Sequence, residues 1–130
     1  MPGASSVPKV ADVSVVAANY NNADYLRDFF ESWIESTVQP AELIFVDDGS
    51  TDESLEIAEQ FSTTLPSLII LKLDPNKGFG NALNAGIERA SCRYIMRVDP
   101  DDVVLRNRLE AQLRVLDADQ ADVVGSNAII

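Results

Sequence analysis

The 130-residue chain is 46% hydrophobic and 24% charged, with no histidine and one cysteine, which is typical of one compact domain and excludes imidazole metal sites and Ser-His or Cys-His nucleophile pairs. Its 21 acidic and 10 basic side chains give a formal charge of -11. That charge argues against a nucleic-acid partner, which needs a basic face, although acidity also serves solubility alone.

The chain begins with MPGASSVPKVAD, and we expect residues 1–10 to be a flexible leader. This stretch lacks the apolar run of a signal peptide. No apolar run in the sequence approaches the roughly 20 residues of a membrane helix. The simplest localisation is cytoplasmic, with membrane association through regions beyond Ile130 left open.

Apolar, β-branched runs alternate with helical patterns along the chain. Val13–Ala18 reads as a buried first strand, and residues 37–40 end the helix that follows it. Leu43–Val46 is the second strand. This alternation predicts an α/β fold with a Rossmann-like, mostly parallel sheet flanked by helices. The first helix carries an apolar stripe formed by Tyr25, Leu26, Phe29, Phe30, Trp33 and Ile34.

The second half repeats the alternation. Ser50 and Glu53 match a capping box, which predicts a helix over residues 51–61. Third and fourth strands are expected at Leu68–Leu73 and Tyr94–Val98, and a fifth begins at residues 122–125. A small-residue stripe predicts a third helix that approaches its neighbour closely, and a leucine stripe predicts a fourth; the residues are Ala82, Leu83, Gly86, Ile87 and Ala90, then Leu105, Leu109, Leu113 and Leu116.

Three polar loops follow predicted strands, at residues 19–22, 47–52 and 99–102. Each loop alone is an ordinary turn composition. In a parallel sheet, however, the carboxyl ends of the strands share one edge, where ligands bind. We therefore expect one site built from all three loops.

Asp99, Asp101 and Asp102 crowd three carboxylates into four residues. A shared divalent cation such as magnesium or manganese would relieve their repulsion, because hard cations take oxygen ligands. The alternative is that Asp101 or Asp102 caps the following helix, where negative charge is favoured.

The other two loops offer groups for an organic ligand. Asp48 is placed to accept hydrogen bonds from a base or sugar, whereas Asp47 is expected to satisfy loop backbone groups. Tyr20 either stacks on a planar base or packs at the sheet edge. Lys77 and Gly78 precede a helix and offer a phosphate one positive charge and backbone amides.

Four segments in order, VSVVAANYNNADYL, FVDDGSTDES, NKGFGNALNAGIERA and YIMRVDPDD, resemble the family-2 glycosyltransferases. These are inverting enzymes with a GT-A fold that use nucleotide-diphosphate sugars. The resemblance covers about residues 10–127. It implies that residues 11–130 form the nucleotide-sugar-binding part of an incomplete GT-A domain, with manganese or magnesium as cofactor.

The resemblance also implies roles for single residues. Tyr20, with the backbone near Ala18, would pack on the base that Asp48 binds. The stretch from residue 76 to 84 would line the ribose and diphosphate. Asp99 would touch the ribose or the metal, and Asp101 would ligate the metal. Within that stretch the expected contacts are Lys77, Gly78 and Asn84.

The carboxylate general base and the acceptor site are expected beyond Ile130, because the family continues further than this chain. The acceptor class (saccharide, lipid or protein) and the oligomeric state stay open. Two alternatives remain: a non-catalytic nucleotide-sugar-binding or interaction domain, and a phosphoacceptor receiver domain. The receiver fits less well, since its acidic pair normally ends the first strand and no lysine follows Lys77 here.

Overall fold

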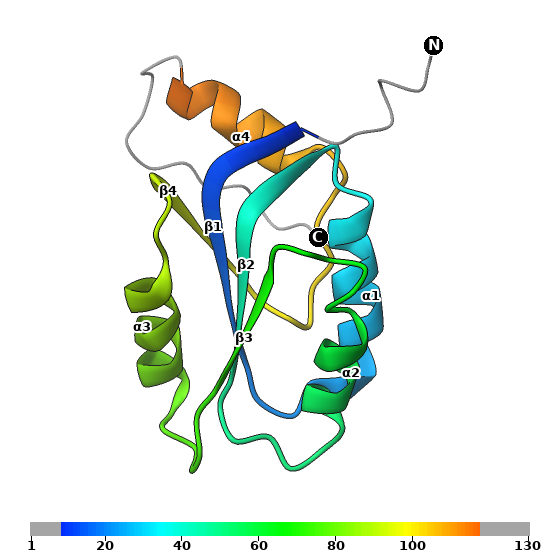
Figure 1. Cartoon of the computed structure of the whole chain (residues 1–130), viewed down its shortest axis with the longest axis vertical. Coiled ribbons are helices and arrows are strands. Elements are labelled where there is room, and N and C mark those ends of the chain that lie inside the picture. Colours follow the sequence, from blue (N-terminus) through cyan, green and yellow to red (C-terminus); the bar gives the residue numbers. More distant parts are fainter. Residues whose placement is uncertain (1–8, 118–130) are drawn as a thin grey trace.

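The computed structural model describes residues 9–117 (Figure 1). Strands and helices alternate through this part of the chain, as the apolar pattern predicts. The elements are β1 (Lys9–Asn19), α1 (Ala23–Ile34), β2 (Val38–Asp47), α2 (Ser54–Gln60), β3 (Leu68–Lys72), α3 (Phe79–Arg89), β4 (Tyr94–Val98) and α4 (Arg108–Asp117).

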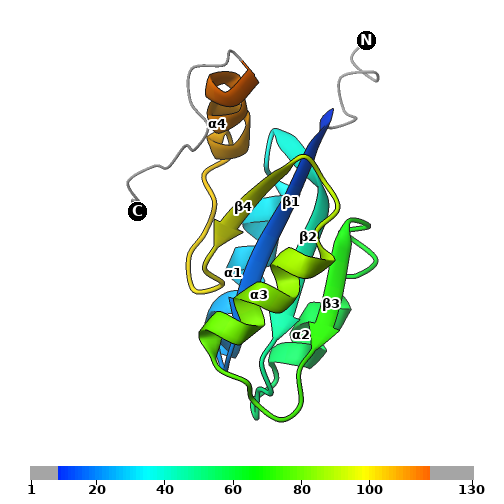
Figure 2. The same cartoon turned by 90° about the vertical axis from the view of Figure 1, so that its left-hand side faces the viewer.

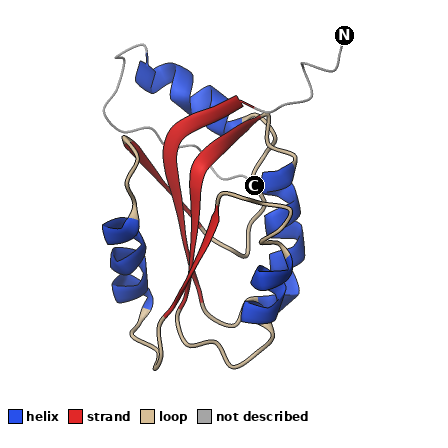
Figure 3. Cartoon of the chain, viewed as in Figure 1, coloured by secondary structure: helices blue, strands red, loops and turns tan. Residues whose placement is uncertain are grey.

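The strands form one parallel sheet in the order β3-β2-β1-β4. Helices α1 and α2 lie on one face of the sheet and α3 lies on the other (Figures 2 and 3). This arrangement confirms the predicted α/β class. The chain winds outward from β1 to β3 and then crosses to the other side of β1 to form β4. The direction of winding therefore changes between β1 and β4, the position at which open α/β sheets bind ligands.

Each face of the sheet buries its own apolar cluster. Alternate side chains of a strand point to opposite faces, so Val15 and Ala17 pack under α1 and α2, whereas Val16 and Ala18 pack under α3. On α1, the fully buried side chains are Leu26, Phe29, Phe30 and Trp33. Tyr25 and Ile34 flank that stripe and are 54% and 37% exposed, so the predicted face was two residues too wide.

Both central strands begin earlier than their apolar runs. β1 starts at Lys9 and β2 at Val38, and these residues pair with each other. Residues 38–40 therefore belong to a strand instead of a helix end. Pro40 fits because pairing of β2 with β3 begins only at Leu43, so residue 40 has an unpaired side where no N–H is needed. The predicted leader overlaps β1 at Lys9 and Val10, and its first eight residues lie outside the described part.

The predicted capping box does not form. Helix α2 begins at Ser54, and its N-cap, Glu53, makes no side-chain cap hydrogen bond. Ser50 is held elsewhere: its N–H and Oγ donate to Asp47 Oδ2 and Oδ1 at 3.0 and 2.7 Å. The charged carboxylate of Asp47, three residues before Ser50, forms a stronger hydrogen bond than the predicted cap with Glu53, three residues after it.

Asp52 joins the starts of the first two helices instead. It accepts N–H donors from Ala23 at 3.0 Å and from Ser54 at 2.9 Å. Burial raises the pKa of the Asp52 carboxyl, but hydrogen bonds from Ser54 and Ala23 outweigh it, and the pKa lies below its ordinary value.

Helix α3 sits very close to the sheet at Gly86. A Cβ at this position would overlap the Val16 side chain and lie 3.0 Å from Cγ2 of Val46. This contact confirms the close approach that the small-residue stripe predicts. It sets the position of α3, whose first turn borders the site described below.

The end of the sheet opposite the site is tied together by Glu42. Its Oε1 accepts the Ser14 hydroxyl at 2.6 Å and the Ser91 N–H at 3.0 Å, and its Oε2 accepts the Ser91 hydroxyl at 2.7 Å. Arg89 lies 3.5 Å from the same Oε2. The Ser14 hydroxyl, together with Ser91 and Arg89, lowers the pKa of the Glu42 carboxyl to about 2 against the opposing effect of burial. The network links β1, β2 and the turn after α3.

The last described elements follow the predictions in part. β4 matches the predicted strand residue for residue, and β3 ends one residue early. α4 begins at Arg108, so Leu105 precedes it and is 65% exposed, whereas Leu109 is buried. The predicted fifth strand lies outside the described residues. Across residues 9–117, no helix is long and apolar enough to cross a membrane.

Candidate nucleotide and metal site

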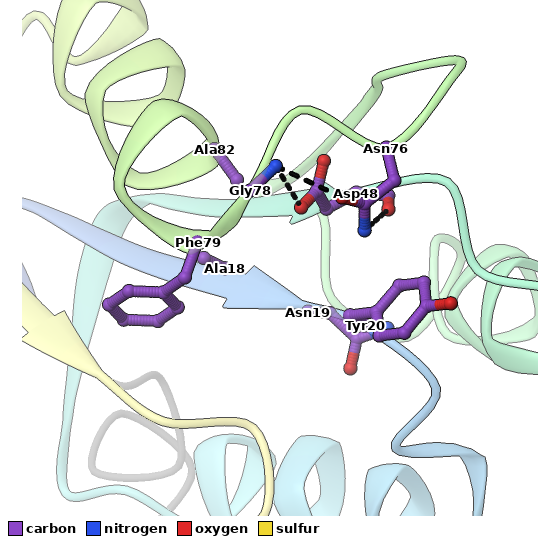
Figure 4. Close-up of a pocket in the computed structure, with 8 residues that line it drawn as sticks. All are labelled: Ala18, Asn19, Tyr20, Asp48, Asn76, Gly78, Phe79 and Ala82. Atoms are coloured by element: carbon purple, nitrogen blue, oxygen red, sulfur yellow. Dashed lines mark hydrogen bonds between the residues drawn. The ribbon is translucent and has the colours of Figure 1, made fainter.

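A pocket of about 220 Å³ lies at the carboxyl ends of β1 and β2, beside the first turn of α3 (Figure 4). Its position is the sheet edge at which the three polar loops were expected to meet. The lining comes from three stretches of the chain: Ala18, Asn19 and Tyr20; Asp48; and Asn76, Gly78, Phe79 and Ala82.

One wall of the pocket is fixed by a buried hydrogen-bonded loop. Asn19 is 1% exposed and donates from Nδ2 to Asp47 Oδ1 at 3.0 Å. Asp47, also 1% exposed, holds Ser50 through both carboxylate oxygens. Asp47 thus satisfies loop groups, as predicted. Asn19 Oδ1 is buried and has no hydrogen-bond partner among the described residues, so the pocket lining contains an unsatisfied acceptor.

Asp48 forms the second wall by holding the loop that leads into α3. Its Oδ1 and Oδ2 accept the N–H groups of Lys77 and Gly78 at 2.7 and 3.0 Å. Asn76 reinforces the joint by donating from Nδ2 to the Asp48 carbonyl at 2.9 Å. Gly78 has a φ of 96°, which favours glycine. The two amides expected to serve a phosphate are therefore donated to Asp48 in this structure.

The rest of the pocket is apolar and carries two exposed rings. Tyr20 and Phe79 are 48% and 53% exposed, and Figure 4 shows Ala18 and Asn19 between them. Ala18 and Ala82 form a floor of small side chains. A flat floor with aromatic rings beside it fits a planar group such as a nucleobase.

The acidic loop after β4 forms the predicted cluster. Oxygen atoms of Asp99, Asp101 and Asp102 all lie within 4.8 Å of one another. Two oxygens on opposite sides of one divalent ion are about 4–5 Å apart, given metal–oxygen distances of about 2.0–2.6 Å, so the cluster fits such an ion. The capping alternative fails, because α4 begins at Arg108 and neither Asp101 nor Asp102 lies at its first turn.

Arg97 connects the acidic loop with the pocket. Its Nη2 lies 3.5 Å from Asp99 Oδ1, and its guanidinium carbon lies 5.2 Å from the centre of the Phe79 ring. Asp99 lines a separate hollow of about 160 Å³ between β4 and α1. The nucleotide-type pocket and the acidic cluster are thus neighbours bridged by one arginine.

The structure brings most predicted site residues to this edge. Ala18, Tyr20, Asp48 and Gly78 line the pocket, and Lys77 is joined to it through its N–H. Asn84 is exposed one turn further along α3 and is not in the lining.

Besides Asn76, three lining residues fall inside predicted ranges but had been assigned no role of their own: Asn19 in the loop 19–22, and Phe79 and Ala82 in the stretch 76–84. Asn19 reads as a loop residue. The other two are brought in by the close seating of α3, for which the small-residue stripe is the available signal.

Comparison with known proteins agrees with this geometry. The family model described as glycosyl transferase family 2 matches residues 14–129. The glycosyltransferase GlyG of Streptococcus pneumoniae is 38% identical over 115 residues, covering 88% of this chain and 38% of the relative. The chain therefore spans well under half of that protein.

Solved structures share the fold. S. aureus TarS 1-349, in complex with UDP-GlcNAc, is 25% identical with a TM-score of 0.79 over 91% of this chain and 37% of its own. The mannosyltransferase PcManGT of Pyrobaculum calidifontis, in complex with GDP-Man and Mn2+, is 22% identical with a TM-score of 0.75, over 85% of this chain and 34% of its own. A family match across nearly the whole sequence, on a GT-A sheet with its polar loops at one edge, means that the chain belongs to glycosyl transferase family 2.

Proposed function

We propose that this chain is the donor-binding part of a metal-dependent glycosyltransferase, which moves a sugar from a nucleotide-diphosphate donor to an acceptor hydroxyl with inversion. One observation carries the proposal: a ring-flanked pocket and a cluster of three carboxylates adjoin at the switch point of a parallel sheet. The family supports it, as do relatives solved with UDP-GlcNAc or with GDP-Man and Mn2+.

The pocket is assigned to the nucleoside. The Tyr20 ring packs on the base, with the backbone at Ala18 alongside. Asp48 keeps the pocket wall in place, and each of its oxygens retains a lone pair for a donor group of the base or ribose. The unsatisfied Asn19 Oδ1 marks a second acceptor in the same lining.

The diphosphate is assigned to the space between the first turn of α3 and the acidic loop. Lys77 contributes its positive charge, and Gly78 leaves room for close approach. Asn84 is proposed as a more distant contact on the same helix. Asp99 and Asp101 hold Mn2+ or Mg2+, with Asp102 beside them. When bound, the metal neutralises the charge that develops on the departing diphosphate.

Inversion follows from attack on the face opposite the leaving group. The residues described here hold the donor by one side, which leaves the anomeric carbon open to an acceptor hydroxyl. A carboxylate beyond Ile130 is proposed as the general base that removes the hydroxyl proton. The localisation proposed for the whole protein is cytoplasmic.

The proposal is tested by titrating the folded chain with UDP and GDP, with and without MnCl₂, in a calorimeter. We expect one of the two nucleotides to bind in the presence of Mn2+ and to bind at least about tenfold more weakly without it, because charged contacts at a desolvated site are each worth about 1.5–3 kcal/mol. Asp101→Ala should remove the metal dependence. Asp28→Ala, which removes an exposed carboxylate on α1, should change neither binding curve.

Circular dichroism of each variant checks that the fold is retained. A folded parent that binds neither nucleotide with Mn2+ would contradict the proposed function. A folded Asp101→Ala variant that behaves like the parent would contradict the metal assignment alone.

A further inference from the structure

Arg97 is the residue whose place between the two halves of the site has consequences beyond the assignments above. It is the penultimate residue of β4, and its side chain is 54% exposed. One side of the guanidinium faces the Phe79 ring, which lines the pocket. Its Nη2 lies 3.5 Å from Oδ1 of Asp99, which belongs to the acidic cluster. A single movable cation therefore touches both the nucleotide side and the metal side.

The ion pair of Arg97 with Asp99 is loose. Its Nη2 to Oδ1 distance is 3.5 Å, whereas charge-assisted N–H···O bonds are about 2.7–2.9 Å long. Both partners are about half exposed, and exposed pairs contribute at most about 1 kcal/mol. Exchanging Asp99 for another anion is therefore easy. Stacking on Phe79 keeps the guanidinium at the pocket edge during such an exchange.

The charges at this edge require a compensating cation. Three carboxylates share the acidic loop, and one divalent ion leaves one of those negative charges uncompensated. A diphosphate adds further negative charge beside them, which the single positive charge assigned to Lys77 does not offset in full. Arg108 lines the same hollow as Asp99, but its Nε is buried, so it is poorly placed to reach the pocket. Arg97 is exposed and adjacent.

We propose that Arg97 is a charge switch: it pairs with Asp99 in the absence of metal, and turns to the diphosphate of the donor once a divalent ion occupies the acidic loop. This inference rests on the proposed function. It makes Arg97 a competitor of the metal and a ligand of the donor, and its planar fork of N–H donors suits phosphate oxygens. A substitution that removes the Arg97 charge should therefore raise the affinity for the metal and lower the affinity for the nucleotide.

The test is Arg97→Gln, measured in two separate titrations. With Mn2+ alone, followed through the electron paramagnetic resonance of the free ion, affinity should rise by about two- to fivefold, because a competing cation is gone. With saturating Mn2+, the affinity for UDP or GDP, whichever the parent binds, should fall at least about tenfold, since a charged hydrogen bond to phosphate is lost. Binding of the matching nucleoside, which has no phosphate, should not change.

Two further variants separate a switch from a structural role. Arg97→Lys keeps the charge without the fork, and should recover part of the nucleotide affinity. Arg93→Gln is the matched control: it removes an arginine from the same part of the chain, one residue before β4, whose guanidinium carbon lies 5.0 Å from the centre of the Tyr94 ring. It should leave both affinities unchanged.

If Arg97→Gln lowered the affinities for Mn2+, nucleotide and nucleoside together, Arg97 would have a structural role. That result would overturn the proposed switch. Unchanged nucleotide affinity would equally overturn it, while the proposed function would stand. If the parent bound no nucleotide with Mn2+, the proposed function would fail and the switch with it.

Discussion

At the scale of single residues, Asp48 shows how a site residue also serves the fold. It is 3% exposed, and both its carboxylate oxygens accept backbone N–H groups from the loop before α3. A carboxylate is suited to this joint because it accepts at both oxygens and donates from neither. The pocket wall therefore depends on the charge of one side chain as well as on its shape.

Asp48→Asn should disturb both stability and binding. The new Nδ2 would face the N–H of Lys77 or Gly78, so two donors would oppose each other and at least one hydrogen bond to a charged acceptor would be lost. We expect the free energy of unfolding to fall by about 1–3 kcal/mol in urea titrations, with weaker nucleotide binding. Asp74→Asn, at an exposed position in the same connection, is the control. Equal stability of the two variants would refute this role for Asp48.

At the scale of elements, the decisive contact is the one between α3 and the sheet. Because Gly86 has no side chain, the helix lies directly on Val16 and Val46. The first turn of the same helix supplies Phe79 and Ala82 to the pocket. The seating of α3 therefore determines how wide the pocket is.

Gly86→Ala should lower the free energy of unfolding by about 1–3 kcal/mol, because the added methyl overpacks the contact with the sheet. This change opposes the helix propensity of alanine, which favours the substitution by up to about 1 kcal/mol. Gly80→Ala is a matched control on the same helix, since nothing lies within 4 Å of a Cβ there. It should be neutral or stabilising in the same denaturation experiment. A Gly86→Ala variant more stable than the parent would contradict the packing argument.

At the scale of the whole molecule, the Glu42 network holds the end of the sheet away from the site. The folded state lowers the pKa of Glu42 from 4.5 to about 2, chiefly through the Ser14 hydroxyl. Between these pKa values the unfolded chain binds more protons than the folded one. The stabilisation is therefore complete above about pH 5 and is lost as the pH falls from 4.5 toward 2.

Glu42→Gln should consequently be less stable than the parent at pH 6, by at most about 3 kcal/mol, with the difference shrinking below pH 4. Urea unfolding at several pH values from 2 to 6 measures this. Glu56→Gln, at an exposed position of α2, controls for the loss of one negative charge. A stability difference that stays constant over the whole range would show that the Glu42 charge is not the cause.

The sequence predicts the architecture well, because buried strands are continuous apolar runs and amphipathic helices have a clear period. The sequence-based prediction fails where contacts with other parts of the chain determine the local structure. Val38 joins β2 because Lys9 pairs with it, and Ser50 leaves its cap because Asp47 binds it. Membership of family 2 also replaces the receiver alternative.

The site follows the same rule. Tyr20 and Asp48 were located by the principle that polar residues after parallel strands share an edge, and both line the pocket. Asn19 and Phe79 lie in ranges predicted to form the site, but their individual roles were not predicted, for different reasons. Asn19 is buried by contacts with the distant Asp47, and Phe79 reaches the pocket only through the packing of α3. The residues next to Asn19 and Phe79 in the sequence indicate neither of these contacts.

Helix α3 is fastened near both ends, by Asp48 holding the loop ahead of Phe79 and by Glu42 holding Arg89 and the turn behind it. The position of the helix on the sheet is therefore set by these contacts at its two ends and by the close packing at Gly86. Its outward face, which carries Ile87 and Glu88, takes part in neither of these end contacts. This face is where the domain can accumulate neutral substitutions during evolution, and where a reporter group can be attached without reshaping the site.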